Sequence, residues 1–148
     1  MTITLISVGK MKQNTYQKEI ESYLKQLPYP IQFIEINDEP TKEGVVKEGK
    51  AILKRIPKNS TVIVMAIEGK MMNSVEFSAY LNELVLMPNK DICFIIGGSY
   101  GLSGEVMSLA TDKISFSKMT FPHQLFKLML VEQIYRAFKI MENHPYHK

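Results

Sequence analysis

The chain has 148 residues, 45% of them hydrophobic, and a net charge of +3. This length and composition fit one compact domain with a real core and exclude a disordered chain. No apolar run approaches the roughly 20 residues of a membrane span, and the N-terminus lacks a signal-peptide layout. The single cysteine, Cys93, lies within an apolar run, which excludes a disulfide framework and favours a reducing compartment. We therefore expect a cytoplasmic protein without a membrane segment.

Apolar periodicity predicts strands that alternate with helices. Strands are expected at residues 2–8, 31–36, 61–67, 92–96 and, briefly, 113–116. Helices are expected at residues 14–27, within 41–55, and at 73–87, 103–111 and 123–143. This order, with no internal repeat and no linker, predicts a single α/β domain over residues 1–148, with a mainly parallel sheet flanked by helices.

Several element boundaries carry their own signals. Asn14 with Gln17, and Asn73 with Glu76, have the spacing of a capping box. Ser103 is expected to cap the short helix after the fourth strand. The third strand is expected to close at residues 68–70, where a glycine stands between two charged residues.

Positive charge gathers in the last quarter of the chain. From Lys113 onward there are six cations and two anions, whereas the preceding residues hold 12 cations and 13 anions. All three histidines, His123, His144 and His147, fall in the same quarter. Together with nearby aromatic residues, this basic end is typical of a surface that binds a polyanion such as RNA. The alternative is an ordinary solvated helix face.

The last predicted helix carries two apolar rows rather than one. The first row contains Leu128, Val131, Tyr135 and Phe138, and the second contains Leu130, Ile134 and Met141. A helix that covers one face of a sheet needs one such stripe. Two rows indicate either a helix that also packs on a second copy of the protein or a wide core-facing surface within one subunit.

The fourth strand ends at a glycine turn, Gly97-Gly98-Ser99-Tyr100-Gly101. A strand, a glycine turn and a helix start in this order suit a small-molecule site at the carboxyl end of a parallel sheet. Glycine backbone can take positive φ and come close to a ligand. The turn matches neither the dinucleotide fingerprint nor a phosphate loop, and a plain structural turn is the alternative.

Two further segments have no role in the predicted core. Residues 115–124 mix small hydroxyls, aromatic rings and a proline, which could give polar groups and apolar walls to an adenine-like ring. Residues 143–148 form a basic, aromatic end, where disorder is the default without a ligand. The spacing of His144 and His147 could chelate a metal, but no cysteine or carboxylate cluster accompanies them, so we predict no metal site.

Four motifs occur in a recognisable order. They are Ile96-Gly97-Gly98-x-x-Gly101-Leu102, residues 115–124, Tyr135-Arg136-Ala137-Phe138-Lys139-Ile140 and Tyr146-His147-Lys148. Together they resemble the RlmH family of the SPOUT superfamily, and the likeness runs nearly end to end from Val8-Gly9-Lys10. Members are bacterial methyltransferases that act on N3 of a pseudouridine in 23S ribosomal RNA. The resemblance therefore implies this activity, with the ribosome as partner.

The resemblance also implies a SPOUT fold with a C-terminal trefoil knot, S-adenosyl-L-methionine bound in the knot loops, and a homodimer with its active site at the subunit interface. Carried over by position, the cofactor-binding residues are Met65, Gly97, Gly98, Gly101, Phe116, Ser117, Lys118, Met119, Thr120 and Phe121. The catalytic candidates are His147 and His123 as bases, Tyr146 as an orienting or stacking group, and Arg136 for an RNA phosphate or the target base. His123 could instead cap the last helix or settle its start.

Some features depart from the family pattern. Members have leucine at the position of Met65 and an acidic residue at that of Ala66, and the segment 38–50 looks shorter here. Two alternatives therefore stay open: a SPOUT methyltransferase with a different RNA target, and a non-catalytic RNA- or ribosome-binding relative. Binding of S-adenosyl-L-methionine separates the second alternative from an enzyme.

Overall fold

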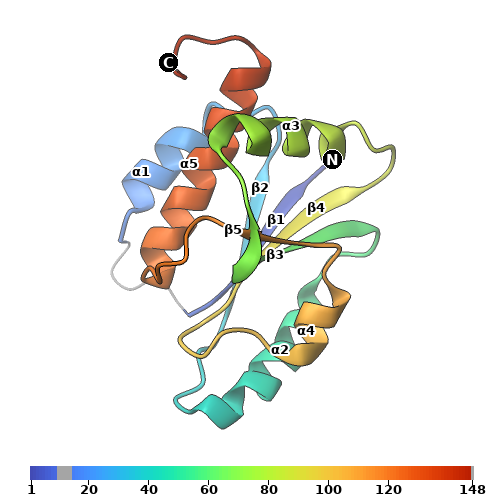
Figure 1. Cartoon of the computed structure of the whole chain (residues 1–148), viewed down its shortest axis with the longest axis vertical. Helices are drawn as coiled ribbons and strands as arrows, with labels where there is room; N and C mark the ends of the chain where they lie inside the picture. Colours follow the sequence, from blue (N-terminus) through green and yellow to red (C-terminus); the bar gives the residue numbers. More distant parts are fainter. Residues whose placement is uncertain (10–14, 148) are drawn as a thin grey trace.

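The computed structural model describes residues 1–9 and 15–147, which form a five-stranded sheet with helices on both faces (Figure 1). The strands are β1 (Ile3–Val8), β2 (Ile31–Ile36), β3 (Ser60–Met71), β4 (Asp91–Ile96) and β5 (Asp112–Ser115). The helices are α1 (Gln17–Leu24), η2 (Lys42–Gly44, a 3-10 turn), α2 (Val45–Arg55), α3 (Ser74–Val85), α4 (Gly104–Leu109) and α5 (His123–Met141). The predicted α/β alternation is confirmed.

The strand order is β2-β1-β4-β3-β5, and every pairing is parallel. The carboxyl ends of the strands therefore meet at one edge of the sheet, where parallel α/β proteins bind their ligands. β1 lies between β2 and β4, so it is buried along its whole length despite its polar Thr4 and Ser7. The parallel sheet expected from the sequence is confirmed, and the trefoil knot stays a prediction.

Apolar side chains cover the sheet on both faces. One face packs on α1, α3 and α5 through residues that include Leu5 and Phe94. The other packs on α2 and α4 through residues that include Ile95 and Cys93. Cys93 is fully buried, and burial raises the pKa of its thiol to about 12. It is therefore an inert core residue rather than a nucleophile.

Both apolar rows of α5 are covered inside one subunit. The helix packs against α1, α3 and β1. Val131 and Tyr135 of the first row and Ile134 of the second are buried, and Leu128 and Met141 are partly buried against the same core. The wide core-facing surface accounts for the two rows, so they do not argue for a second copy. No helix among residues 1–9 and 15–147 has the length and apolar character to cross a membrane.

Two of the predicted helix caps are present. The amide N–H of Glu76 donates to the Asn73 side chain at 2.8 Å, and that of Asn73 donates to the Glu76 carboxylate at 3.0 Å. Ser103 caps α4 by accepting a hydrogen bond from the amide of Val106. The expected cap at Asn14 lies outside the described residues.

The predicted end of the third strand is wrong, because β3 continues past it. Met65 and Lys70 both pair with Ile114 of β5, so residues 66–69 leave the ladder as a bulge. Gly69 permits this arrangement, since a Cβ at its position would lie 2.6 Å from the backbone nitrogen of Ile114. A glycine inside a strand marks such a close approach of two backbones.

Candidate functional site

A cavity of about 370 Å³ opens at the carboxyl edge of the sheet. Its walls come from the β3 bulge, the glycine turn after β4, the segment after β5 and the start of α5. The predicted binding residues that line it are Met65, Gly97, Gly98, Gly101, Phe116, Ser117, Met119, Thr120 and Phe121. Lys118 is exposed and stands outside this lining. Residues far apart in the sequence therefore meet in a hollow of the size that small ligands occupy.

The glycine turn forms a wall from which side chains are excluded. The carbonyl of Gly98 accepts a hydrogen bond from the amide of Gly101 at 3.1 Å, and Gly101 has a φ of +80°. A Cβ at Gly97 would lie 2.9 Å from Cγ of Leu102, and one at Gly98 would lie 2.8 Å from Cγ1 of Val8. Both distances are shorter than an ordinary carbon contact. Bare backbone therefore faces the cavity here.

The segment after β5 is held in place by its own side chains. The hydroxyl of Ser115 donates to the carbonyl of Ser117 at 2.9 Å, and the hydroxyl of Ser117 accepts from the amide of Met119 at 3.0 Å. The ring of Phe116 stacks on that of Phe126 from α5, with 5.0 Å between centroids. A fixed backbone thus stands beside an aromatic wall, which suits a flat ring with a polar edge.

Glu68 lines the cavity although the sequence pattern did not single it out. The sequence predicts a closing turn at this residue, whereas the bulge of β3 makes it part of the cavity wall beside Ala66 and Ile67. The signal that could have indicated this is Gly69, since a glycine within a strand pattern is typical of a bulge. The cavity therefore has a carboxylate even though position 66 is alanine.

His123, the first residue of α5, also lines the cavity. Its ring packs against Gly9, where a Cβ would lie 2.6 Å from Nε2 of His123. This Nε2 is buried and has no hydrogen-bond partner among the described residues. The N-cap residue of α5 is Pro122, which makes no side-chain capping bond, and His123 is the first residue of the helix, so its role in setting the helix start stays a prediction. The ring therefore forms part of the cavity wall, while its Nε2 is buried beside Gly9.

The C-terminal residues fold back on α5 and form a tail cluster of Glu132, Arg136, Tyr146 and His147. One carboxylate oxygen of Glu132 accepts from the Tyr146 phenol at 2.9 Å and from Nε and Nη2 of Arg136 at 2.9 and 2.6 Å. The guanidinium lies 4.8 Å from the centre of the Tyr146 ring, and Nη1 approaches Nδ1 of His147 at 3.4 Å. Burial raises the pKa of the Tyr146 phenol, and hydrogen bonds with Tyr23 and Glu132 raise it further. The phenol therefore stays protonated as a donor.

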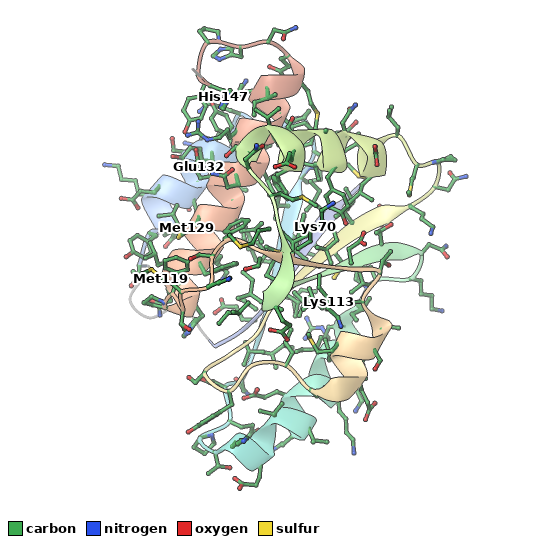
Figure 2. The ribbon with its side chains drawn as sticks, in the orientation of Figure 1. Lys70, Lys113, Met119, Met129, Glu132 and His147 are labelled. Atoms are coloured by element: carbon green, nitrogen blue, oxygen red, sulfur yellow. The ribbon has the colours of Figure 1, made fainter. Side chains whose placement is uncertain are left out.

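The two groups of predicted site residues lie apart along α5 (Figure 2). Met119 and His123 are at its start, and His147 lies beyond its end. Arg136, which His147 contacts, follows His123 by 13 residues along this helix, a rise of roughly 20 Å. The structure therefore does not bring Arg136, Tyr146 and His147 to the cavity of the same chain.

Comparisons with known proteins identify the family. A family model described as "Predicted SPOUT methyltransferase" matches residues 1–147. The chain belongs to the SPOUT methyltransferase family. Ribosomal RNA large subunit methyltransferase H of Acholeplasma laidlawii is 51% identical to it over 148 residues, which cover both chains in full. Ribosomal RNA large subunit methyltransferase H 1 of Clostridium perfringens strain SM101 is 47% identical over 159 residues, again with both chains covered in full. The resemblance inferred from the four motifs is confirmed.

In this SPOUT methyltransferase a groove of about 570 Å³ lies between the cavity and the tail cluster. Side chains of α1, α3 and α5 line it, among them Leu128 and Met129. It shares Ile114 and Phe116 with the cavity and Glu132 with the tail cluster. The groove therefore connects the two groups of predicted site residues along one side of the molecule.

Proposed function

We propose that this SPOUT methyltransferase transfers a methyl group from S-adenosyl-L-methionine to N3 of a pseudouridine in 23S ribosomal RNA, on the assembled ribosome in the cytoplasm. The observation that carries the proposal is the cavity at the carboxyl edge of the sheet, where the β3 bulge, the glycine turn and the segment after β5 meet. The relatives named above support the choice of large-subunit ribosomal RNA as substrate.

The cavity fits S-adenosyl-L-methionine in size and chemistry. About 370 Å³ lies within the range of small-molecule pockets. Phe116 offers an apolar wall for the adenine ring, and the bare backbone at Gly97 and Gly98 allows close approach. Glu68 offers a carboxylate that can accept hydrogen bonds from ribose hydroxyls or from the amino group. The bound sulfonium supplies an electrophilic methyl group.

The protein contributes alignment and control of a proton. Methyl transfer from a sulfonium is an in-line displacement, so fixing the target base against the cavity supplies much of the rate. The imide N3 must lose its proton before it attacks, and His147 and His123 are the residues suited to that step. Arg136 holds a phosphate or orients the base, and the protonated Tyr146 orients it or stacks on it.

A homodimer brings these residues together. The tail cluster and the cavity of one chain lie apart along α5, and the groove lies between them. When two subunits pack groove to groove about a two-fold axis, the cavity of each meets the tail cluster of the other. Each active site then consists of a cavity from one subunit and a tail from its partner.

Titration calorimetry with S-adenosyl-L-methionine tests the enzyme against a non-catalytic RNA-binding relative. We expect binding, and no heat at millimolar cofactor would contradict any methyltransferase function. Light scattering at micromolar protein is expected to give a dimer, and a monomer there rules out the composite site.

The RNA target needs a separate experiment. The gene is expressed in a strain that lacks this ribosomal modification, and N3-methylpseudouridine is then mapped in its 23S RNA. We expect the modification to return. A protein that binds the cofactor yet leaves that nucleotide unmethylated is a SPOUT methyltransferase with another target.

A further inference from the structure

The carboxylate of Glu132 is held from several sides. Its Oε1 receives the three hydrogen bonds from Arg136 and Tyr146 described above, and its Oε2 accepts from Nε2 of Gln133 at 3.0 Å. The Oε1 of Gln133 in turn accepts from the hydroxyl of Ser74 on α3 at 2.8 Å. The Glu132 side chain is 18% exposed. Charge-assisted bonds in a partly buried place fix the direction of such a carboxylate.

The guanidinium of Arg136 links the fixed carboxylate of Glu132 to His147 in the C-terminal segment. Nε and Nη2 point at Glu132, the plane lies over the Tyr146 ring, and Nη1 is left to face Nδ1 of His147 at 3.4 Å. A guanidinium has only donors, so Nη1 donates and Nδ1 accepts. A neutral imidazole that accepts at Nδ1 carries its proton on Nε2. The Nε2–H of His147 is therefore the group left to donate a hydrogen bond.

We propose that Glu132, Arg136 and His147 act as a carboxylate–guanidinium–imidazole chain that presents the Nε2–H of His147 to the target base as a hydrogen-bond donor. The identity of that base rests on the proposed function. Within the chain Glu132 is a positioning residue, because it acts through Arg136. His147 is the residue that touches the substrate.

With His147 as a hydrogen-bond donor, the N3 imide of pseudouridine is activated by stabilisation of its anion rather than by a histidine base. The N3 proton leaves to a solvent water molecule, and the negative charge that remains spreads onto the two flanking carbonyl oxygens. The Nε2–H of His147 stabilises one of these oxygens, as a fixed donor does in an oxyanion hole. The N3 lone pair then forms a bond to the methyl carbon while the carbon–sulfur bond breaks, and its electron pair stays on sulfur. In this scheme His147 accepts no proton, so the donor role replaces the base role offered to His147 under the proposed function.

The tautomer can be measured in the free protein, without RNA or cofactor. Long-range ¹H–¹⁵N correlation spectra at about pH 8, where an ordinary histidine is neutral, distinguish the two tautomers. We expect His147 as the Nε2–H form in the wild type and a mixture of tautomers in Glu132→Gln. A wild-type His147 protonated at Nδ1 overturns the proposal, as does an unchanged Nε2–H form in Glu132→Gln. The matched control is Glu142→Gln, which removes the partner of Lys139 on the same helix and should leave the spectrum of His147 unchanged.

Single-turnover methylation separates a donor from a base. The amide N–H of glutamine can replace the Nε2–H of histidine as a donor but cannot act as a base. We expect His147→Ala to slow the step by about 10²-fold and His147→Gln to stay within about tenfold of the wild type. Equal losses in the two variants would refute the donor role. An inactive wild type would instead count against the proposed function, and the spectra would still test the chain.

Discussion

Gly97→Ala is the substitution that tests the glycine wall most directly. The added Cβ would lie 2.9 Å from Cγ of Leu102 and 3.1 Å from the carbonyl carbon and oxygen of Gly101. The first distance is roughly 0.6 to 1.1 Å inside the carbon contact distance of about 3.5–4.0 Å. Two of the three atoms belong to backbone, so rotation of a side chain cannot relieve the overlap. The turn itself must move.

The magnitude follows from the cost of overpacking, about 1–3 kcal/mol. If the strain falls on the ligand-binding form of the turn, the Kd for S-adenosyl-L-methionine rises about 5- to 150-fold. Titration calorimetry measures this change, and thermal unfolding checks that the variant is folded. Gly104→Ala is the matched control, because a Cβ there meets nothing within 4 Å and Gly104 begins α4. Wild-type affinity in Gly97→Ala would refute the assignment of this wall to the cofactor.

Three further changes test the fold around the site. Asn73→Ala removes the capping box with Glu76 and should lower the free energy of unfolding by about 1 kcal/mol in urea denaturation; an unchanged midpoint would mean that the cap is not a stabilising feature. Lys127 is buried with its ammonium over the ring of Phe33, and desolvation lowers its pKa. Lys127→Met should therefore raise the free energy of unfolding by about 1 kcal/mol near neutral pH. Because the pKa of Lys127 is lower in the folded than in the unfolded chain, the stability gained by Lys127→Met should shrink as the pH rises towards the usual lysine pKa of about 10.4. A gain in stability that does not change with pH would contradict desolvation of Lys127 as its cause. Phe116→Ala should cost about 2 kcal/mol of stability and also weaken cofactor binding, and normal calorimetric affinity would exclude a ring contact.

Local sequence patterns predicted the helices and strands well because the formation of these elements depends mainly on residues that are close in sequence. The strand before Gly97 and the caps at Asn73 and Ser103 follow from composition and from spacings of three residues, and the structure has them. The course of β3 has a weaker local signal, the glycine at position 69, and depends also on a contact that is remote in sequence. Position 69 requires a glycine because a Cβ there would lie 2.6 Å from the backbone nitrogen of Ile114, a residue remote in sequence.

In the candidate site, too, some residues could be predicted from local motifs and others depend on contacts that are remote in sequence. Motif order was enough to place nine of the ten expected cofactor residues along one cavity, with Lys118 outside it. No motif indicates that Glu132 belongs to the site, because a single glutamate on a helix usually faces solvent. Glu132 joins the tail cluster because the C-terminal segment folds back and the Tyr146 phenol donates a hydrogen bond to it. The sequence does not predict this contact, since the ends of a chain are disordered by default. Long-range contacts of this kind are set by tertiary packing, which local periodicity does not encode.

The burial of Cys93 has a practical consequence for fluorescence work on this protein. Thiol reagents attack the thiolate, and a pKa of about 12 together with complete burial keeps Cys93 unreactive near neutral pH. A cysteine introduced at Met119, whose residue is 73% exposed beside the cavity, would therefore carry a dye at one defined position without removal of the native thiol. Changes at the cavity mouth could then be followed in real time in an otherwise native chain.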